Sequence, residues 1–149
     1  MAPDVSVVIA SYNAHATIEP CLTALAAIET AVPFEIVVVD SSADGTAEVV
    51  ASRFPGVTLV RSGTRLYPGD ARNLGVERAR AQIVAFTDAD CIVDPRWIDE
   101  LVEAHRGDVL AVGGSIDNAN PESLVGWANY FCEFAAWMPA GRPRPLQEI

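Results

Sequence analysis

The chain has 149 residues, the size of one domain, and its 50% hydrophobic content can supply a substantial core. Twenty Asp and Glu residues oppose ten arginines, and there is no lysine, so the net charge is −10 at pH 7. This balance argues against nucleic acid as a partner, and an acidic chain that binds a phosphate needs a metal ion or well-placed arginines.

Targeting signals and cysteine patterns are both lacking in the sequence. No basic segment with a long apolar core stands at the N-terminus, and no apolar run reaches the ~18 to 20 residues of a membrane-spanning helix. Cys21, Cys91 and Cys132 form no C-x-x-C pair, so we expect buried free thiols rather than a zinc site or disulfides. We therefore expect a soluble, cytoplasmic chain, although a longer parent protein could be membrane-associated.

Strand-like and helix-like segments alternate along the chain. Apolar, mostly β-branched runs predict strands at residues 5–10, 35–40, 57–60, 83–87 and 109–113. Segments with an apolar face predict helices at residues 17–28, 46–54, 70–81 and 95–105. Thr17, Thr46 and Asp94 are the expected N-caps, and Pro95 suits the first position of the last helix.

This alternation predicts an α/β fold, with a doubly wound, mostly parallel sheet and helices on both faces. We expect every strand to be buried, because the runs are nearly continuous in apolar residues. The carboxyl ends of parallel strands meet at one edge, where ligands bind. That edge would collect residues 11–13, 40–45 and 88–90.

Two acids, Asp88 and Asp90, come directly after the strand at 83–87. Carboxylate oxygens two residues apart can converge on one hard cation such as Mg²⁺ or Mn²⁺, which is commonly shared with a substrate phosphate. The alternative for such a D-x-D pattern is a solvated turn between strand and helix. We favour the metal site because other polar segments are expected on the same edge.

The sequence changes character from Leu124 onwards. Five aromatic residues follow within a short span: Trp127, Tyr130, Phe131, Phe134 and Trp137. A helix with this much aromatic surface is normally buried, so an unpaired one would promote self-association or, as a second interpretation, contact with a membrane surface. We expect an α/β domain over residues 1–120, and an aromatic helix with an irregular tail over residues 121–149. No closing element follows the tail, which suggests that the natural protein continues.

Four stretches together resemble the N-terminal part of family 2 glycosyltransferases of the GT-A fold: VSVVIASYNA, EIVVVDSSADGT, GDARNLGVERA and IVAFTDADC. The resemblance implies that residues 1–120 bind a nucleotide sugar and that residues 121–149 begin an incomplete acceptor-side region. By the same resemblance, Ser11 and Tyr12 line the nucleotide pocket, and Asp40 hydrogen-bonds the base or ribose. Arg72 would contact the base or diphosphate. The D-x-D acids Asp88 and Asp90 would hold Mn²⁺ or Mg²⁺, with Asp88 also counted in the nucleotide-sugar site.

The implied activity is metal-dependent transfer of a sugar from a nucleotide-diphosphate sugar to an acceptor hydroxyl, with inversion. UDP-sugars are favoured over GDP-sugars, and the unknown acceptor is lipid-linked or a polysaccharide. The general base lies in a downstream segment in such enzymes, so the catalytic residue is unknown here. Outside the main site, we expect Asp44 to hold a local turn and Gly75 to allow close helix packing. We expect Arg65 to be a solvated surface residue, with a further phosphate contact as the alternative.

Three other functions are alternatives to this one. A nucleotide-sugar-binding fragment without turnover is the main alternative, because the segment with the base is absent. A sugar-phosphate nucleotidyltransferase is disfavoured, since no Gly-rich basic loop follows the first strand. A dinucleotide-dependent oxidoreductase is disfavoured because that turn lacks G-x-G-x-x-G.

Overall fold

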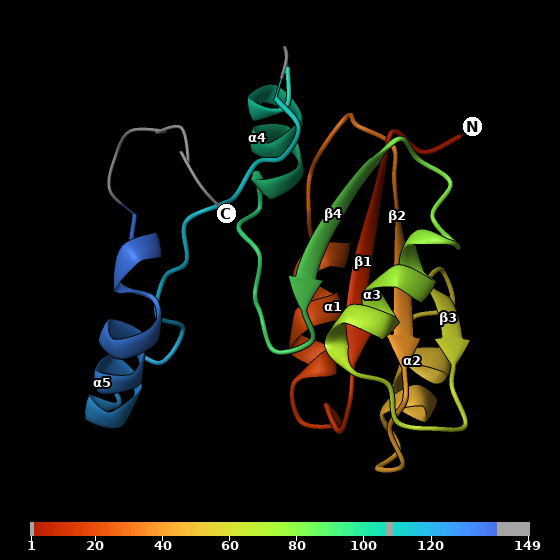
Figure 1. Cartoon of the computed structure of the whole chain (residues 1–149), viewed down its shortest axis with the longest axis horizontal. Coiled ribbons are helices and arrows are strands. Elements are labelled where there is room, and N and C mark those ends of the chain that lie inside the picture. The colour runs from red at the N-terminus through yellow and green to blue at the C-terminus, as the bar shows by residue number, and fades with distance from the viewer. Residues whose placement is uncertain (1, 107–108, 140–149) are drawn as a thin grey trace. The chain divides into compact units, whose positions relative to one another are not determined.

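The computed structural model describes residues 2–106 and 109–139, arranged in two compact units that divide between Glu103 and Ala104. The elements are β1 (Val5–Ser11), α1 (Ile18–Ala26), β2 (Phe34–Asp40), α2 (Thr46–Arg53), β3 (Thr58–Arg61), α3 (Pro68–Val76), β4 (Ile83–Asp88), α4 (Trp97–Ala104), α5 (Leu124–Glu133) and the 3₁₀ turn η1 (Ala135–Trp137) (Figure 1). Most of the predicted irregular tail lies outside the described residues.

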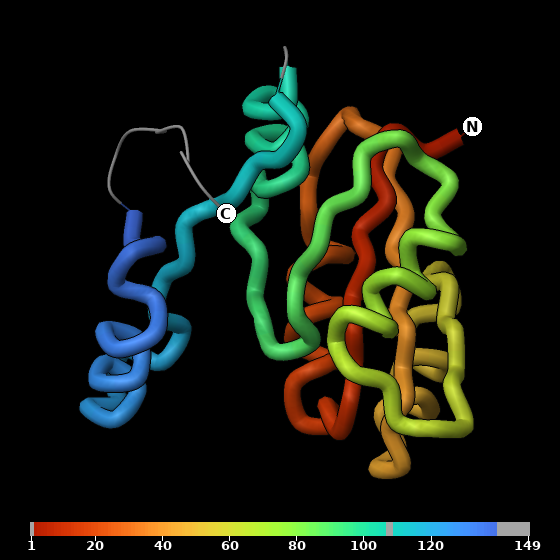
Figure 2. Tube along the Cα trace, viewed as in Figure 1, coloured from red at the N-terminus to blue at the C-terminus, as the bar shows by residue number. Residues whose placement is uncertain are grey.

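The first unit is built on a parallel sheet with strand order β3-β2-β1-β4. The register pairs Ser11 with Asp40, Ala10 with Asp88, and Asp40 with Arg61. The strands therefore end level with one another, and the loops after β1, β2 and β4 gather at one edge (Figure 2). The predicted α/β fold with a parallel sheet is confirmed.

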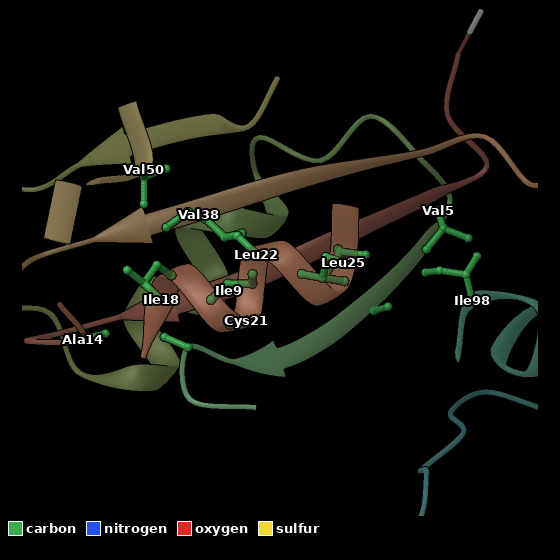
Figure 3. Close-up of a cluster of buried hydrophobic side chains, with 13 residues drawn as sticks. Val5, Ile9, Ala14, Ile18, Cys21, Leu22, Leu25, Val38, Val50 and Ile98 are labelled. Carbon is green, nitrogen blue, oxygen red and sulfur yellow. The ribbon is translucent and has the colours of Figure 1, made fainter. Parts of the chain in front are cut away.

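Alternate residues of β1 and β2 feed two hydrophobic clusters, one on each face of the sheet. Val5 and Ile9 of β1 join Val38 of β2 in the cluster that holds the buried residues of α1 and Val50 of α2 (Figure 3), and Val7 belongs to the same cluster. The intervening Val8, Val37 and Val39 pack with Ala71 of α3 on the other face. Because side chains alternate between the faces of a strand, strands covered on both sides are expected to be apolar along most of their length, as β1 and β2 are between Val7 and Ala10 and between Ile36 and Val39.

Helix α3 lies very close to the sheet at Gly75. A Cβ atom at this position would stand 2.3 Å from Cγ1 of Val8 and 3.4 Å from Cγ2 of Val39. Real Cβ atoms do not approach other atoms at 2.3 Å, so any side chain at position 75 would force the helix or the Val8 side chain to move. The predicted packing role of Gly75 is confirmed.

Several boundaries differ from the sequence prediction. Helix α3 begins at Pro68 and ends at Val76, several residues before the predicted end. Thr46 is the first residue of α2 rather than its N-cap, which is Gly45 in the left-handed conformation. Helix α4 begins only at Trp97, so Asp94 precedes it and instead accepts a hydrogen bond from the Arg96 amide at 2.8 Å.

The predicted strand at 109–113 was wrong, because these residues form neither a strand nor a pairing in the described structure. Leu110 is fully exposed, and an apolar run becomes a strand only when a neighbouring strand pairs with it. The prediction that every strand is buried was also wrong. Phe86 of β4, at one edge of the sheet, is 47% exposed, and no residue of β3, at the other edge, is fully buried.

The second unit contains the predicted aromatic helix, α5. The hydroxyl of Ser123 caps it by accepting a hydrogen bond from the Gly126 amide at 3.0 Å. Tyr130 is buried and donates to the carbonyl of Ile116 at 2.7 Å. Leu124 and Val125, in contrast, are 88% and 70% exposed, so the aromatic helix is only partly buried within the described chain.

None of the helices in the described ranges is long and apolar enough to cross a membrane.

Candidate active site

The carboxyl edge of the sheet brings together Ser11, Asp40 and Asp88 at the ends of β1, β2 and β4. Tyr12 follows Ser11 directly, and its side chain is 44% exposed. Ser11 is buried, and its hydroxyl has no hydrogen-bond partner in the described structure. A buried hydroxyl without a partner is a group that a ligand or water can satisfy.

Asp40 is held by Ser42, two residues further along the chain. The Ser42 hydroxyl donates to Oδ1 of Asp40 at 2.6 Å, and the Ser42 amide donates to Oδ2 at 3.3 Å. The same hydroxyl accepts a hydrogen bond from the Asn13 amide at 2.7 Å, and Asn13 has a left-handed φ of 52°. Ser42 therefore joins the loop after β1 to the loop after β2.

Sequence reasoning passed over this role of Ser42. The signal was present, because an Asp followed two residues later by Ser is a common pattern for a turn held by side-chain hydrogen bonds. The contact with Asn13 joins residues 29 apart, and no local pattern predicts it.

Asp44 has the local role that the sequence predicted. Its carboxylate accepts hydrogen bonds from the hydroxyl and the amide of Thr46, which begins α2, and from the amide of His15 at 3.1 Å. These hydrogen bonds, led by that from the Thr46 hydroxyl, lower the pKa of Asp44 below its usual value. Its carboxylate thus fixes the start of α2 and the loop before α1.

Asp88, Asp90 and Cys91 form a small cluster of metal-binding side chains at the end of β4. One ligand atom from each lies within 4.8 Å of the other two. Ligands of one Mg²⁺ or Mn²⁺ ion stand up to about 4 Å apart, so small side-chain movements would bring these donors to one ion. The carboxylates of Asp88 and Asp90 fit a hard divalent cation, whereas the Cys91 thiol, whose pKa is raised by burial, is a poor ligand for such an ion.

Arg72 of α3 donates to Oδ1 of Asp88 at 2.6 Å. Both side chains are partly exposed, at 37% and 57%. In the described part of the chain only this oxygen of Asp88 is paired, which leaves Oδ2 for an ion. Two predicted site residues from different elements are thus brought into direct contact.

Cys21 of α1 contacts the backbone at the end of β4. Its thiol lies 3.5 Å from the carbonyl oxygen of Asp88, and the Cys91 amide donates to the same oxygen at 3.1 Å. Burial, together with the neighbouring Cys91 and the two acids, raises the pKa of Cys21 to about 12. Cys21 is therefore a protonated structural thiol, whereas Cys91 and Cys132 are exposed, contrary to the expectation of buried cysteines.

A surface hollow of about 340 Å³ lies beside Asp40. Its walls include Ser42, Gly45, Arg61 and Gly63, from the ends of β2 and β3 and the loops that follow them. Arg72 and Asp88 do not line it. Asp40 thus lies at the border of this hollow. On its other side, the end of β1 separates Asp40 from the acidic cluster at the end of β4.

Comparison with known proteins decides which family has this arrangement. The family model described as glycosyl transferase family 2 matches residues 6–146. The chain belongs to glycosyltransferase family 2. The resemblance inferred from the sequence motifs is thereby confirmed.

Relatives of this family 2 chain extend the comparison. Succinoglycan biosynthesis protein ExoO of Rhizobium meliloti (strain 1021) is 37% identical over 126 residues, which cover 83% of this chain and 35% of the relative. The structure of mannosyltransferase PcManGT from Pyrobaculum calidifontis, in complex with GDP-Man and Mn²⁺, superimposes with a TM-score of 0.68 at 28% identity, covering 78% of this chain and 36% of that one.

S. aureus TarS 1-349 in complex with UDP-GlcNAc superimposes with a TM-score of 0.62 at 26% identity, covering 77% of this chain and 38% of TarS. The family 2 chain thus has the GT-A fold of these enzymes, as predicted. It spans about a third of the length of each of these three proteins.

Proposed function

We propose that this family 2 chain is the donor-binding part of a glycosyltransferase that uses a nucleotide-diphosphate sugar and a divalent metal ion. The observation that carries the proposal is the meeting of Asp40 and the Asp88–Asp90 cluster at one edge of the sheet. Support comes from the mannosyltransferase bound to GDP-Man and Mn²⁺ and from TarS bound to UDP-GlcNAc.

Asp40 and its neighbours would bind the nucleoside. The buried Asp40 carboxylate can accept a hydrogen bond from a base N–H or a ribose hydroxyl, and Ser42 orients it. Ser11 offers an unpaired hydroxyl, and Tyr12 offers an exposed ring. Of the two donor classes, UDP-sugars remain the first expectation and GDP-sugars the second.

The acids at the end of β4 would hold Mn²⁺ or Mg²⁺ beside the diphosphate. A bound divalent ion supplies charge neutralisation for the nucleoside diphosphate that leaves as the sugar is transferred. Arg72, paired with Asp88, keeps one carboxylate in place and puts a guanidinium close to where the diphosphate would lie.

Transfer with inversion requires a general base that removes the proton of the acceptor hydroxyl. We propose that this base, and the surface for a lipid-linked or polysaccharide acceptor, belong to a further part of a longer protein. The alternative is a module that binds the nucleotide sugar without turnover. The two are distinguished by assaying the chain, alone and within any longer reading frame, for hydrolysis or transfer of a UDP-sugar.

The metal site is tested by calorimetric titration of UDP and GDP into the chain, with and without Mn²⁺. We expect Mn²⁺-dependent binding of one nucleotide, and we expect the double variant Asp88→Asn/Asp90→Asn to lose most of the metal-dependent part. A loss of at least ten-fold is expected for two charged ligands.

The matched control is Asp4→Asn/Glu29→Gln, which removes two exposed acids from outside the site, since Asp4 precedes β1 and Glu29 lies between α1 and β2. This control should bind like the unaltered chain. Equal metal-dependent affinity in the Asp88→Asn/Asp90→Asn variant would contradict the assignment of these acids as metal ligands.

A further inference from the structure

Arg65, in the loop between β3 and α3, lies against two tyrosine rings. Its guanidinium carbon is 4.4 Å from the ring centre of Tyr12 and 5.7 Å from that of Tyr67. The two tyrosine residues are 44% and 69% exposed. The sequence predicted a solvated surface arginine, and Arg65 is indeed exposed, but it makes specific ring contacts.

These contacts position the charge of Arg65. A cation over the face of an aromatic ring is attracted by the negative electrostatic potential of that face. A guanidinium held in this way keeps N–H groups free, and these match the oxygens of a phosphate in pairs. Because Tyr12 directly follows Ser11, the guanidinium is held at the carboxyl edge of the sheet.

The charge balance of this edge indicates what Arg65 can bind. Arg72 is paired with Asp88, and Arg61 is paired with Glu48 at 2.9 Å. Arg65 has no carboxylate partner within the described residues. Apart from these paired arginines, the charged groups at this edge are carboxylates. The carboxylates repel an approaching diphosphate, and the unpaired Arg65 offsets this repulsion.

We propose that Arg65 binds the diphosphate of the nucleotide, and that Tyr12 and Tyr67 hold its guanidinium in position for that contact. This inference rests on the proposed function and adds a residue to it. Arg65 supplies a positive charge that is independent of the metal ion, and Tyr67 acts through Arg65 as a positioning residue.

The test compares ligands that differ only in their phosphates. Uridine, UMP and UDP, and guanosine, GMP and GDP, are titrated into the unaltered chain and into Arg65→Gln, with and without Mn²⁺. We expect Arg65→Gln to weaken UDP or GDP binding by about ten-fold, as for loss of a hydrogen bond to a charged group, and to leave nucleoside binding within about two-fold.

Three further variants sharpen the result. Arg53→Gln, which removes an exposed arginine paired with Glu19 on α1, should bind every ligand normally. Arg65→Lys keeps the charge but not the planar fork and should recover part of the diphosphate affinity. Tyr67→Phe should retain that affinity, whereas Tyr67→Ala should lower it. Equal melting temperatures of Arg65→Gln and the unaltered chain would show that folding is intact.

Two results would overturn the inference alone. The first is unchanged UDP and GDP affinity in Arg65→Gln, and the second is an equal loss of nucleoside and diphosphate affinity, which would assign Arg65 to the base. Failure of the unaltered chain to bind any of the six ligands would overturn the proposed function together with this inference.

Discussion

Ser42 has a larger effect on the site than its size suggests. One hydroxyl donates to Asp40 and accepts from the Asn13 amide, so it orients a proposed ligand-binding carboxylate and fixes the loop that carries Tyr12. Its neighbour Ser41 has a buried hydroxyl with no partner in the described structure. The two serines therefore differ in their hydrogen bonds, although they are adjacent in sequence.

We expect Ser42→Ala to reduce nucleoside affinity about three- to ten-fold and to lower the free energy of unfolding by about 1 kcal/mol, because two hydrogen bonds are lost. Ser42→Thr keeps a hydroxyl and should recover most of the affinity. Titration calorimetry with uridine or guanosine and urea denaturation measure the two effects.

Ser41→Ala is the control for this prediction. It removes a buried hydroxyl that has no hydrogen-bond partner in the described structure, so it should not lower the free energy of unfolding. If Ser41→Ala and Ser42→Ala behaved alike, the hydrogen bonds of Ser42 would not be the cause of its effect.

At the level of elements, sequence patterns predicted the positions of strands along the chain better than they predicted which segments pair with one another. The strands β1 and β2 were predictable, because sheet neighbours on either side and helices on both faces require continuous apolar residues. Residues 109–113 have a similar composition but form no strand, since pairing with a neighbour is not encoded in a local run.

The same limit applies to the candidate site. Asp40 and Asp88 are the last residues of their strands and Asp90 follows β4, so parallel topology alone placed them on one edge. The contacts of Arg65 with Tyr12, and of Ser42 with Asn13, join separate loops and depend on how those loops fold. Motifs therefore located the acids, whereas the residues that orient them required the structure.

Helix α3 provides a test of close packing with an internal control. Gly75→Ala would place a methyl group 2.3 Å from Val8, and we expect a loss of about 1–3 kcal/mol in the free energy of unfolding from overpacking. Gly69 lies in the same helix with nothing within 4 Å of a Cβ atom. Gly69→Ala should therefore be neutral or stabilising by up to about 1 kcal/mol.

Urea denaturation of the two variants measures the difference. A Gly75→Ala variant as stable as Gly69→Ala would mean that α3 moves away from the sheet at little cost, contrary to the close packing described here.

At the level of the whole molecule, Glu35 links stability to pH at the amino end of the sheet. Its side chain is only 8% exposed, and Arg80 lies 2.7 Å away. Burial opposes ionisation, but hydrogen bonds from the Ser6 hydroxyl and from the amide and side chain of Arg80 outweigh it and lower the pKa of Glu35 below 4.5. Ionised Glu35 therefore stabilises the folded chain.

Because the folded-state pKa is lowered, this stabilisation is fully present above pH 4.5 and is lost as the pH falls through the folded-state value. We expect Glu35→Gln to lower the free energy of unfolding by about 1.5–3 kcal/mol at pH 7. The difference from the unaltered chain should shrink steadily below pH 4.5. Denaturation at pH values from 3 to 7 tests this, and a difference that does not depend on pH would contradict the role of the charge.

The second unit has one property that concerns the whole molecule. Leu124, Val125 and Phe131 of α5 are largely exposed, although Tyr130 is buried and hydrogen-bonded. Self-association through this aromatic segment stays a prediction, and so does the division of function at residue 120. The structural division falls earlier, between Glu103 and Ala104.

Gly75 also affects the position of the Arg72 guanidinium, although the two residues are not in contact. It lies three residues, or nearly one helical turn, from Arg72, so the depth at which α3 rests on the sheet and the position of the Arg72 guanidinium vary together. A methyl group at position 75 would push α3 away from the sheet and would move the Arg72 guanidinium away from Asp88. The absence of a side chain on one face of the helix thus determines how an arginine on the same helix meets its partner.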